Sequence, residues 1–379
     1  MISYILLLWG VFLISLITTF NENKIFKSNS VDVISPKIKM GNHLFINQFL
    51  LMIIIILLSI FAGSRISYND TFVYIRRYTL EVPTSLFSLD PSYLEISNNP
   101  AFWIYQTLIK SYISTDPQIF IAISSVLYIM SFVYFYWRFS PKFGMSIFLF
   151  ITLGLFLLGM AAIKQILAIS IGIWAVYFAS EKKWVKFFLL VLLASLFHPF
   201  ALLYLLIPLI ISKDVWTVKT FFMIITVFVI GSLFESFINV LMVLTGNIKD
   251  YSESSFEESV SIFRVLVYGV PVFLSFIYKR NINEHGNHFI KLCINASVVS
   301  FLFMVLSFFG GAILFSRAGA FFSPMSLIAL PWILVNCIPR KQKIMIYYLF
   351  FTLYFIYFFY GTFINVDFSY KSIFSWLNI

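Results

Sequence analysis

Long apolar stretches, separated by short polar segments, run through almost the whole chain. Most of them hold roughly 20 residues rich in Phe, Leu and Ile, the length that an α-helix needs to cross the hydrocarbon core of a bilayer. The main predicted spans are 2–20, 46–64, 117–137, 143–162, 165–180, 220–245, 262–278, 289–310, 318–338 and 344–364. The pattern predicts an all-α, polytopic transmembrane helical bundle of about 10–12 membrane segments.

One apolar region, 184–212, departs from this pattern. His198-Pro199 divides it into two pieces of about 14 residues, each too short to cross the hydrocarbon core. Proline ends a helix, and broken backbone at membrane depth is tolerated only where it lines a cavity or is buried in protein. We therefore predict a hairpin of half-helices there and expect a functional role near His198.

The longest polar segment is 65–116, which carries Pro83, Pro91, Pro100 and many Tyr, Ser and Asn. It is the predicted main extracytoplasmic loop, and 100–113 within it has the pattern of a short interfacial helix. No repeat or linker divides the sequence, so we expect a single integral membrane domain over 1–379.

Composition and charge fit a membrane protein and add its orientation. Hydrophobic residues make up 61% of the chain and charged residues 11%, and the net charge is +10. The first apolar stretch has no charge before it and several Lys after it, which predicts an uncleaved anchor with its N-terminus outside. The predicted inside loops 21–45, 138–142, 181–186, 213–219, 279–291 and 339–343 then hold about 17 of the 26 Lys and Arg. The basic charge therefore reflects topology and contact with the lipid bilayer, and no nucleic-acid partner is expected.

A few charged residues fall at the predicted outer ends of spans. An ionisable group at this depth is usually paired, exposed to a water-filled cavity or functional. For Arg65 and Lys164, a snorkelling anchor is an equally good interpretation. Arg317 follows a Gly310-Gly311 turn, which favours a functional role. Together these charges suit an anion such as a lipid-linked diphosphate, although voltage sensing, lipid binding and anion transport would use similar charges. The full set is Arg65, Asp70, Arg76, Arg77, Lys164, Arg264 and Arg317.

Other chemistry finds little support. His198 fits a buried core histidine as well as a proton carrier, and the helix break favours the second. His285 and His288 have no third ligand or cysteine nearby, so no metal is expected. No nucleotide-binding or cofactor motif occurs, and we expect no cofactor.

Several short segments follow one another in a fixed order along the chain, and together they indicate a family. They are Arg65-Ile66-Ser67-Tyr68-Asn69-Asp70 with Tyr74, Asn99-Pro100-Ala101-Phe102, Thr115-Asp116-Pro117-Gln118, Lys164-Gln165, Ser195-Leu196-Phe197-His198, Phe315-Ser316-Arg317 with Phe321-Phe322, and Ser369-Tyr370-Lys371-Ser372-Ile373-Phe374. In these segments the chain resembles the EpsG family of bacterial exopolysaccharide and capsule polymerases, which are grouped with the Wzy-type polymerases. It departs from the family pattern where Tyr68-Asn69-Asp70 replaces Gly-Thr-Asp, Lys164-Gln165 replaces Arg-Gln and Ser369-Tyr370-Lys371 replaces Pro-Tyr-Lys.

The resemblance implies a glycosyltransferase that polymerises oligosaccharide repeat units linked to undecaprenyl diphosphate, for O-antigen, capsule or exopolysaccharide. The reaction would take place at the outer face of the bacterial cytoplasmic (inner) membrane. A chain-length regulator and a flippase are the implied protein partners. The implied roles are diphosphate binding by Arg65 and Arg317 with support from Lys164, proton removal by His198 or Asp70 with a slight preference for His198, and sugar binding or orientation by Gln165 and Tyr74.

Three other activities share these features. A flippase or transporter of the lipid-linked oligosaccharide would use the same basic cavity but should need access from both leaflets, and few ionisable residues lie on the inner half of the spans. A lipid-linked glycan ligase and a membrane acyltransferase also act from one side with a histidine. The sequence favours the polymerase and leaves the other activities open.

Overall fold

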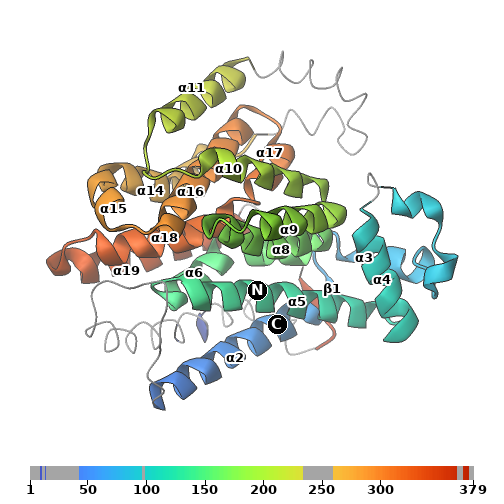
Figure 1. Ribbon diagram of the computed structural model, residues 1–379. Coiled ribbons are helices and arrows are strands. Elements are labelled where there is room, and N and C mark those ends of the chain that lie inside the picture. Colours follow the sequence, from blue (N-terminus) through green and yellow to red (C-terminus); the bar gives the residue numbers. More distant parts are fainter. Residues whose placement is uncertain are drawn as a thin grey trace. The chain divides into compact units, whose positions relative to one another are not determined.

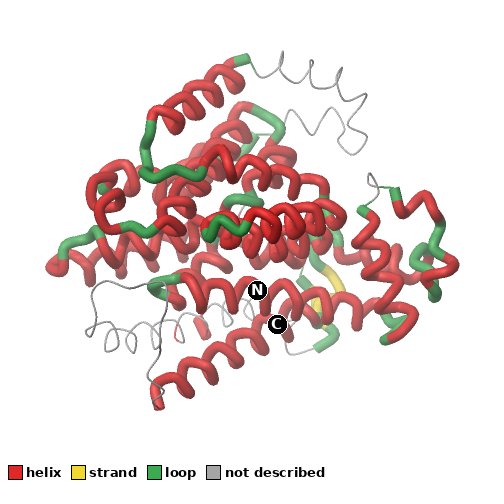
Figure 2. Tube along the Cα trace, viewed as in Figure 1, coloured by secondary structure: helices red, strands yellow, loops and turns green. Residues whose placement is uncertain are grey.

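The computed structural model describes residues 9–10, 13, 42–95, 99–233, 259–364 and 370–374. The described residues are 81% helical and contain one sheet of two short strands (Figure 2). The predicted all-α, polytopic fold class is confirmed. The predicted span 2–20 and the predicted outer segment 246–261 lie outside the described residues, apart from a few positions.

Four helices in the described chain are long and apolar enough to cross a membrane. They are α5 (Pro117–Phe139), α8 (Ile163–Ser180), α16 (His288–Phe309) and α19 (Arg340–Phe359). Three bent pairs of consecutive helices meet the same requirements together, which makes seven candidate spans if each pair is one span. The pairs are α6 (Phe143–Thr152) with α7 (Leu155–Ala161) at 49°, α14 (Ile262–Ile277) with α15 (Lys279–His285) at 73°, and α17 (Ala312–Gly319) with α18 (Ser323–Asn336) at 57°. The chain is therefore a multi-pass membrane protein.

The break predicted at His198-Pro199 is present. Helix α9 (Trp184–Phe197) ends directly before His198, and a 3₁₀-helix, η5 (Pro199–Leu206), begins at the proline. Proline has no backbone N–H and cannot continue the α-helical hydrogen-bond ladder. Helix α10 (Ile207–Ile210) follows directly. The hairpin over 184–212 stays a prediction.

The described residues form two compact units, and the first contains the N-terminal part, helix α9 and the C-terminal end. Helix α5 packs against α2 along its length, and α6 and α7 also pack against it. The two long helices approach closely because Gly63 has no side chain, and a Cβ there would lie 3.1 Å from the Cα of Ala122. Besides α5, most of α8 and most of α19, unit 1 contains α2 (Asn42–Gly63), β1 (Arg65–Ser67), α3 (Thr71–Leu80), η2 (Leu86–Ser88), η3 (Pro91–Leu94), α4 (Pro100–Tyr112), α6, α7, α9, the π-helical turn η6 (Tyr360–Ile364) and β2 (Lys371–Ser372).

Gly159 in α7 lies directly against the ring of Tyr128 in α5. A Cβ at this glycine would lie 2.5 Å from the ring, closer than any van der Waals contact allows. We expect Gly159→Ala to lower the thermal unfolding midpoint of the purified protein, at a cost of about 1–3 kcal/mol, because the buried ring must move. Gly361→Ala is the matched control, because a Cβ there meets no atom within 4 Å. Equal midpoints for the two variants would contradict this packing.

Unit 2 is built around helix α16. Helices α11 (Val218–Ser232), α14, α17 and α18 all pack against it (Figure 1), and most of its residues are buried. Gly319 at the end of α17 lies against α16, where the hydroxyl of Ser300 donates to the Gly319 carbonyl over 3.2 Å. The N-cap residue of α17 is Gly311, whose φ of 61° lies in the left-handed region that favours glycine.

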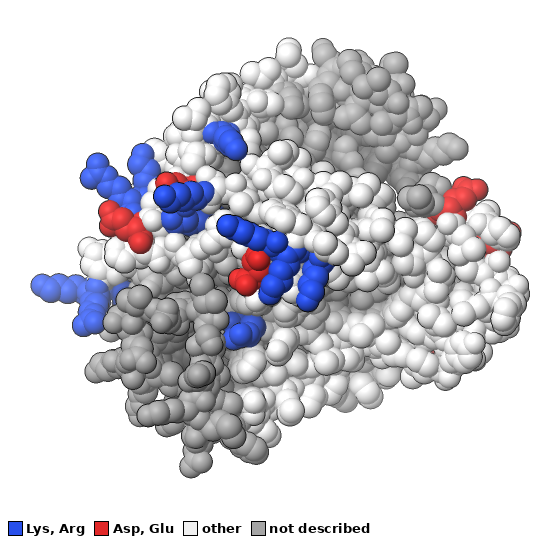
Figure 3. All heavy atoms as spheres, viewed as in Figure 1, with Lys and Arg blue, Asp and Glu red and all other residues white. Residues whose placement is uncertain are grey.

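Several basic residues lie at or directly after helix ends, as in Arg138, Lys182 and Arg340. On the face drawn in Figure 3, Lys and Arg side chains gather in groups and leave large areas without charge. The segment 279–285, part of the predicted inside loop 279–291, forms helix α15, which ends at Gly286. Its side of the membrane stays a prediction.

Candidate functional site

Arg65 is the centre of the candidate site in unit 1. It follows helix α2 directly in strand β1, and its side chain is 0% exposed. Its Nε donates to the Thr71 hydroxyl over 3.3 Å, and its Nη1 donates to the Ser125 hydroxyl over 3.0 Å and to the Ala62 carbonyl. The guanidinium thus connects α2, the start of α3 and the middle of α5.

The Arg65 guanidinium is hydrogen-bonded only to neutral groups among the described residues. Among the described residues no carboxylate lies within ion-pair distance of it, and its Nη2 is buried without a hydrogen-bond partner. Burial lowers the pKa of the guanidinium, and four tyrosines with favourable electrostatic interactions oppose this effect. They are Tyr128, Tyr74, Tyr370 and Tyr68. A buried cation with no anionic partner and an uncommitted NH2 group creates a positive potential that favours an anion nearby.

Asp70 lies on the turn that Arg65 supports. The Thr71 hydroxyl that accepts from Arg65 also donates to the Tyr68 carbonyl over 2.6 Å, which fixes the turn before α3. Asp70 is the N-cap residue of that helix, yet its side chain makes no capping hydrogen bond and is half-buried. The turn therefore fixes the backbone of Asp70, and the carboxylate is not used to cap the helix. Burial raises the pKa of the neighbouring Tyr68 to about 12, so this tyrosine stays neutral near pH 7.

The C-terminal segment pairs with the strand that carries Arg65. Strand β2 pairs antiparallel with β1, with Arg65 opposite Ser372. The Ser372 hydroxyl lies 2.8 Å from that of Ser64, and the Tyr370 hydroxyl donates to the Phe61 carbonyl over 2.8 Å. The Tyr370 ring stacks on the Phe61 ring with centroids 4.3 Å apart. Residues more than 300 positions away thus complete the surroundings of Arg65.

Gln118 at the start of α5 supports the same strand. Its side-chain amide donates to the Gly63 carbonyl over 2.6 Å and to the Arg65 carbonyl over 3.2 Å. Parts of three sequence segments that carried the family resemblance therefore meet at β1, namely 65–70, 115–118 and 370–374. Sequence reasoning assigned no role to Gln118, Tyr370 or Ser372, although their segments were part of the pattern. Ser125 gave no sequence signal.

Two adjacent serines of α5 connect Arg65 with the region of His198. Ser125 accepts from Arg65, and Ser124 makes a 2.9 Å hydrogen bond with the Tyr105 hydroxyl of α4. The ring of Tyr105 in turn contacts that of Phe197, 6.2 Å between centroids. Phe197, the last residue of α9 before His198, therefore contacts α4, and α4 in turn packs on α5.

His198 is buried, with 7% exposure, at the break between α9 and η5. Its Nδ1 accepts a hydrogen bond from the Phe200 backbone N–H over 3.2 Å. An accepting Nδ1 carries no proton, so the neutral ring carries its proton on Nε2 and presents a donor there. This tautomer suits hydrogen-bond donation better than proton removal.

The remaining predicted residues of unit 1 lie on two helices. Tyr74 in α3 is buried, packs edge-to-face on Phe102 and interacts electrostatically with Arg65. Lys164 and Gln165 open helix α8, with Lys164 half-buried and Gln165 only 1% exposed. The structure brings Tyr74 to Arg65, and the predicted roles of Lys164 and Gln165 stay predictions.

Arg317 belongs to unit 2. It lies half-buried in the last turn of α17, between the buried Phe315 and the closely packed Gly319. Phe321 and Phe322, which follow it, pack against Tyr204 with ring centroids 5.6 and 5.9 Å apart. Its predicted role with Arg65 stays a prediction.

Comparison with known proteins identifies the family. No curated protein matches the chain, and no solved structure matches it. The sequence profile of the EpsG family matches residues 48–375, which is most of the chain and includes every segment that meets at β1. This membrane protein therefore belongs to the EpsG family, whose membership suggests a role of the polysaccharide polymerase type.

Proposed function

We propose that the protein polymerises oligosaccharide repeat units carried on undecaprenyl diphosphate, at the outer face of the bacterial cytoplasmic membrane. The observation that carries this proposal is the convergence of three distant family segments on one buried arginine with an uncommitted NH2 group. A site for a diphosphate leaving group needs positive charge that no protein carboxylate neutralises, and Arg65 meets this requirement.

The reaction joins two lipid-linked glycans. An acceptor hydroxyl of one unit attacks the anomeric carbon of the growing glycan, and the bond from that carbon to the diphosphate oxygen breaks. The electron pair leaves with undecaprenyl diphosphate, and a base takes the acceptor proton. The protein must therefore stabilise the departing diphosphate, orient the hydroxyl and hold the base.

Arg65 contributes in two ways in this proposal. Its buried charge stabilises the leaving diphosphate, and its Nη2 amino group, which has no hydrogen-bond partner among the described residues, is the donor. Its bond to Thr71 also orients the turn that carries Asp70. Arg317 and Lys164 would add positive charge, Lys164 as a point charge because it lacks the planar guanidinium. Tyr74 and Gln165 would bind sugar hydroxyls or orient the charged groups.

We assign the base to Asp70 and donation to His198. The Asp70 carboxylate is half-buried and makes no capping bond, so it can accept the proton of the acceptor hydroxyl. Because His198 Nδ1 accepts from the Phe200 N–H, the neutral ring carries its proton on Nε2, and in this proposal that N–H donates to the diphosphate or to a sugar oxygen. This assignment reverses the slight preference for His198 as the base that the sequence suggested.

Two substitutions separate the functions of the His198 nitrogens. Asn places an oxygen near Nδ1 and can still accept from Phe200, whereas Gln places an amide N–H near Nε2. We expect His198→Gln to keep part of the polymer yield and His198→Asn to lose most of it, at equal membrane abundance. Gel electrophoresis of the surface glycan measures both yields, and a higher yield from the Asn variant would contradict the donor role.

Deletion and complementation test the function itself. We expect a strain without this gene to carry single capped repeat units, and the wild-type gene to restore long chains in electrophoresis of the surface glycan. Arg317→Ala should fail to restore them if Arg317 contributes to the site. Long chains in the deletion strain would overturn the polymerase assignment, and single units trapped inside the cell would indicate a flippase.

A further inference from the structure

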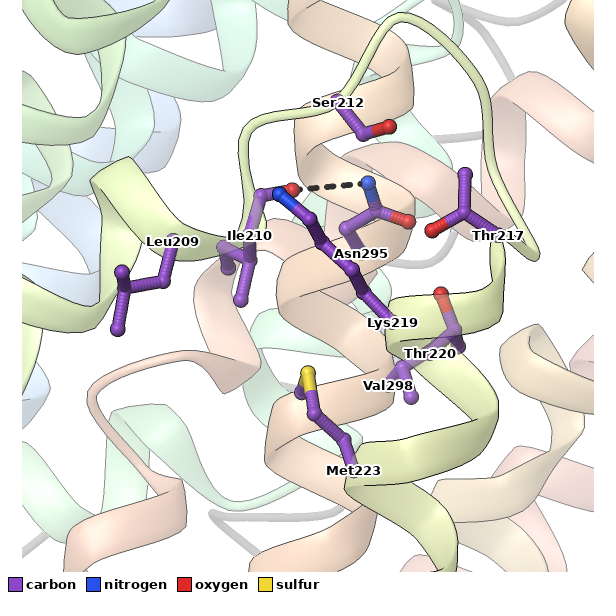
Figure 4. A pocket seen from close by; sticks show the side chains of 9 residues that line it. All are labelled: Leu209, Ile210, Ser212, Thr217, Lys219, Thr220, Met223, Asn295 and Val298. Atoms are coloured by element: carbon purple, nitrogen blue, oxygen red, sulfur yellow. Dashed lines mark hydrogen bonds between the residues drawn. The ribbon is translucent and has the colours of Figure 1, made fainter.

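A pocket in unit 2 shares no lining residue with the residues assigned to polymerisation. It is small and open, and it is formed by the end of α10, the connection to α11, the first turns of α11 and the middle of α16 (Figure 4). Its polar lining consists of Asn295, Thr217, Thr220, Lys219 and Ser212. The other lining residues are Leu209, Ile210, Met223 and Val298.

Asn295 supplies an acceptor that the protein does not use. Its residue is 7% exposed, and its Nδ2 donates to the Ile210 carbonyl over 3.0 Å, which fixes the orientation of the amide. Its Oδ1 is buried and has no hydrogen-bond partner among the described residues. In Figure 4 this oxygen points toward Thr217, into the pocket. A buried unpaired acceptor is costly, and a ligand donor would relieve that cost.

The other polar groups are donors suited to an anion. Among the described residues, the Lys219 ammonium makes no ion pair or hydrogen bond, and it is exposed at the first turn of α11. The Thr217 side chain makes no capping bond, so its hydroxyl is available as well. The nearby Lys291 differs, because Asp214 lies 3.3 Å from its ammonium and neutralises it. Lys219 is therefore the cation that remains for a ligand.

The surroundings favour an amphiphilic ligand. Helix α11 exposes a series of large apolar side chains, among them Val218, Phe222 and Ile225, each at least 60% exposed. In a membrane protein such a face contacts acyl chains. The predicted topology also puts 213–219 on the inner side, where anionic phospholipids are enriched.

We propose that this pocket binds the headgroup of an anionic phospholipid, of the phosphatidylglycerol type. Its phosphate accepts from Lys219 and the threonine hydroxyls, and a headgroup hydroxyl donates to Asn295 Oδ1. The acyl chains lie along the apolar face of α11. The lipid is a bound structural ligand and does not enter the polymerisation reaction, so this inference does not depend on the proposed function.

The test measures lipid binding to the full-length protein in detergent. Native mass spectrometry counts retained phosphatidylglycerol, with phosphatidylcholine at the same concentration as the neutral comparison. We expect Lys219→Ala to bind phosphatidylglycerol about fivefold more weakly, the effect of one basic residue at a membrane surface. Lys213→Ala is the matched control, because it removes the same charge from an exposed residue that does not line the pocket.

Each other outcome would overturn the proposal. Equal losses in both lysine variants would show general attraction to basic charge, and unchanged retention in Lys219→Ala would show that the pocket does not hold the lipid. Thr220→Val gives a second test with the shape preserved and should also weaken retention. A further experiment replaces the lipid with glycerol 3-phosphate, a soluble compound that carries the same phosphate and glycerol groups without acyl chains. If it raises the thermal unfolding midpoint as much as the lipid does, the ligand is a free phosphate and the assignment to lipid is wrong.

Discussion

Asp70→Asn should lower the rate of polymerisation by about 100-fold or more while the protein remains at wild-type abundance in the membrane. The expected loss is that of a general base, since an amide cannot take the proton of the acceptor hydroxyl. Folding should be unaffected because Asn has the same shape and the Asp70 side chain makes no capping bond. The measurement is the yield and length of surface glycan from cells with equal amounts of each variant in the membrane.

Asp90→Asn is the control for the loss of a carboxylate from the same polar segment. The Asp90 side chain is exposed and accepts from the Ser92 backbone N–H over 2.9 Å, a bond that Asn can also accept. We expect long chains from this variant. Long chains from Asp70→Asn as well would exclude Asp70 as the base and return the role to another group.

Tyr370→Ala should weaken both the fold around Arg65 and the activity. The variant loses the ring stacked on Phe61 and the hydrogen bond to the Phe61 carbonyl, together about 2 kcal/mol. Because β2 pairs with the strand that carries Arg65, the guanidinium should also lose its fixed position. We therefore expect a lower thermal unfolding midpoint, and a glycan yield that falls further than the membrane abundance does.

Lys371→Ala is the matched control on the same short strand. Its side chain is exposed, so the substitution should change stability by at most about 0.5 kcal/mol and leave the glycan unchanged. If Tyr370→Ala and Lys371→Ala gave the same glycan and the same unfolding midpoint, the C-terminal segment would have no part in holding the site. Tyr370→Phe keeps the stacked ring and removes only the hydroxyl, so it measures the contribution of the hydrogen bond alone.

The amino-acid sequence was enough to predict the helical membrane fold, the break at His198-Pro199 and the membership of the EpsG family. These features are local or compositional: an apolar run long enough to span, a proline that cannot continue a helix, and short ordered motifs. Local rules failed where helices bend, as at α14 and α15, because the angle depends on packing against neighbouring helices.

The contacts that hold the candidate site together could not be predicted without the folded structure. The sequence selected Arg65 and Asp70, but nothing in it showed that Arg65 is wholly buried or that Thr71 connects it to the turn of Asp70. The pairing of Arg65 with Ser372 joins residues more than 300 positions apart, and no periodicity reports such a contact. The preference between Asp70 and His198 likewise depended on one hydrogen bond at Nδ1, which is a matter of side-chain geometry. Patterns along a chain show which residues are available, whereas burial and hydrogen-bond partners, which determine the chemistry, are fixed only when distant segments pack together.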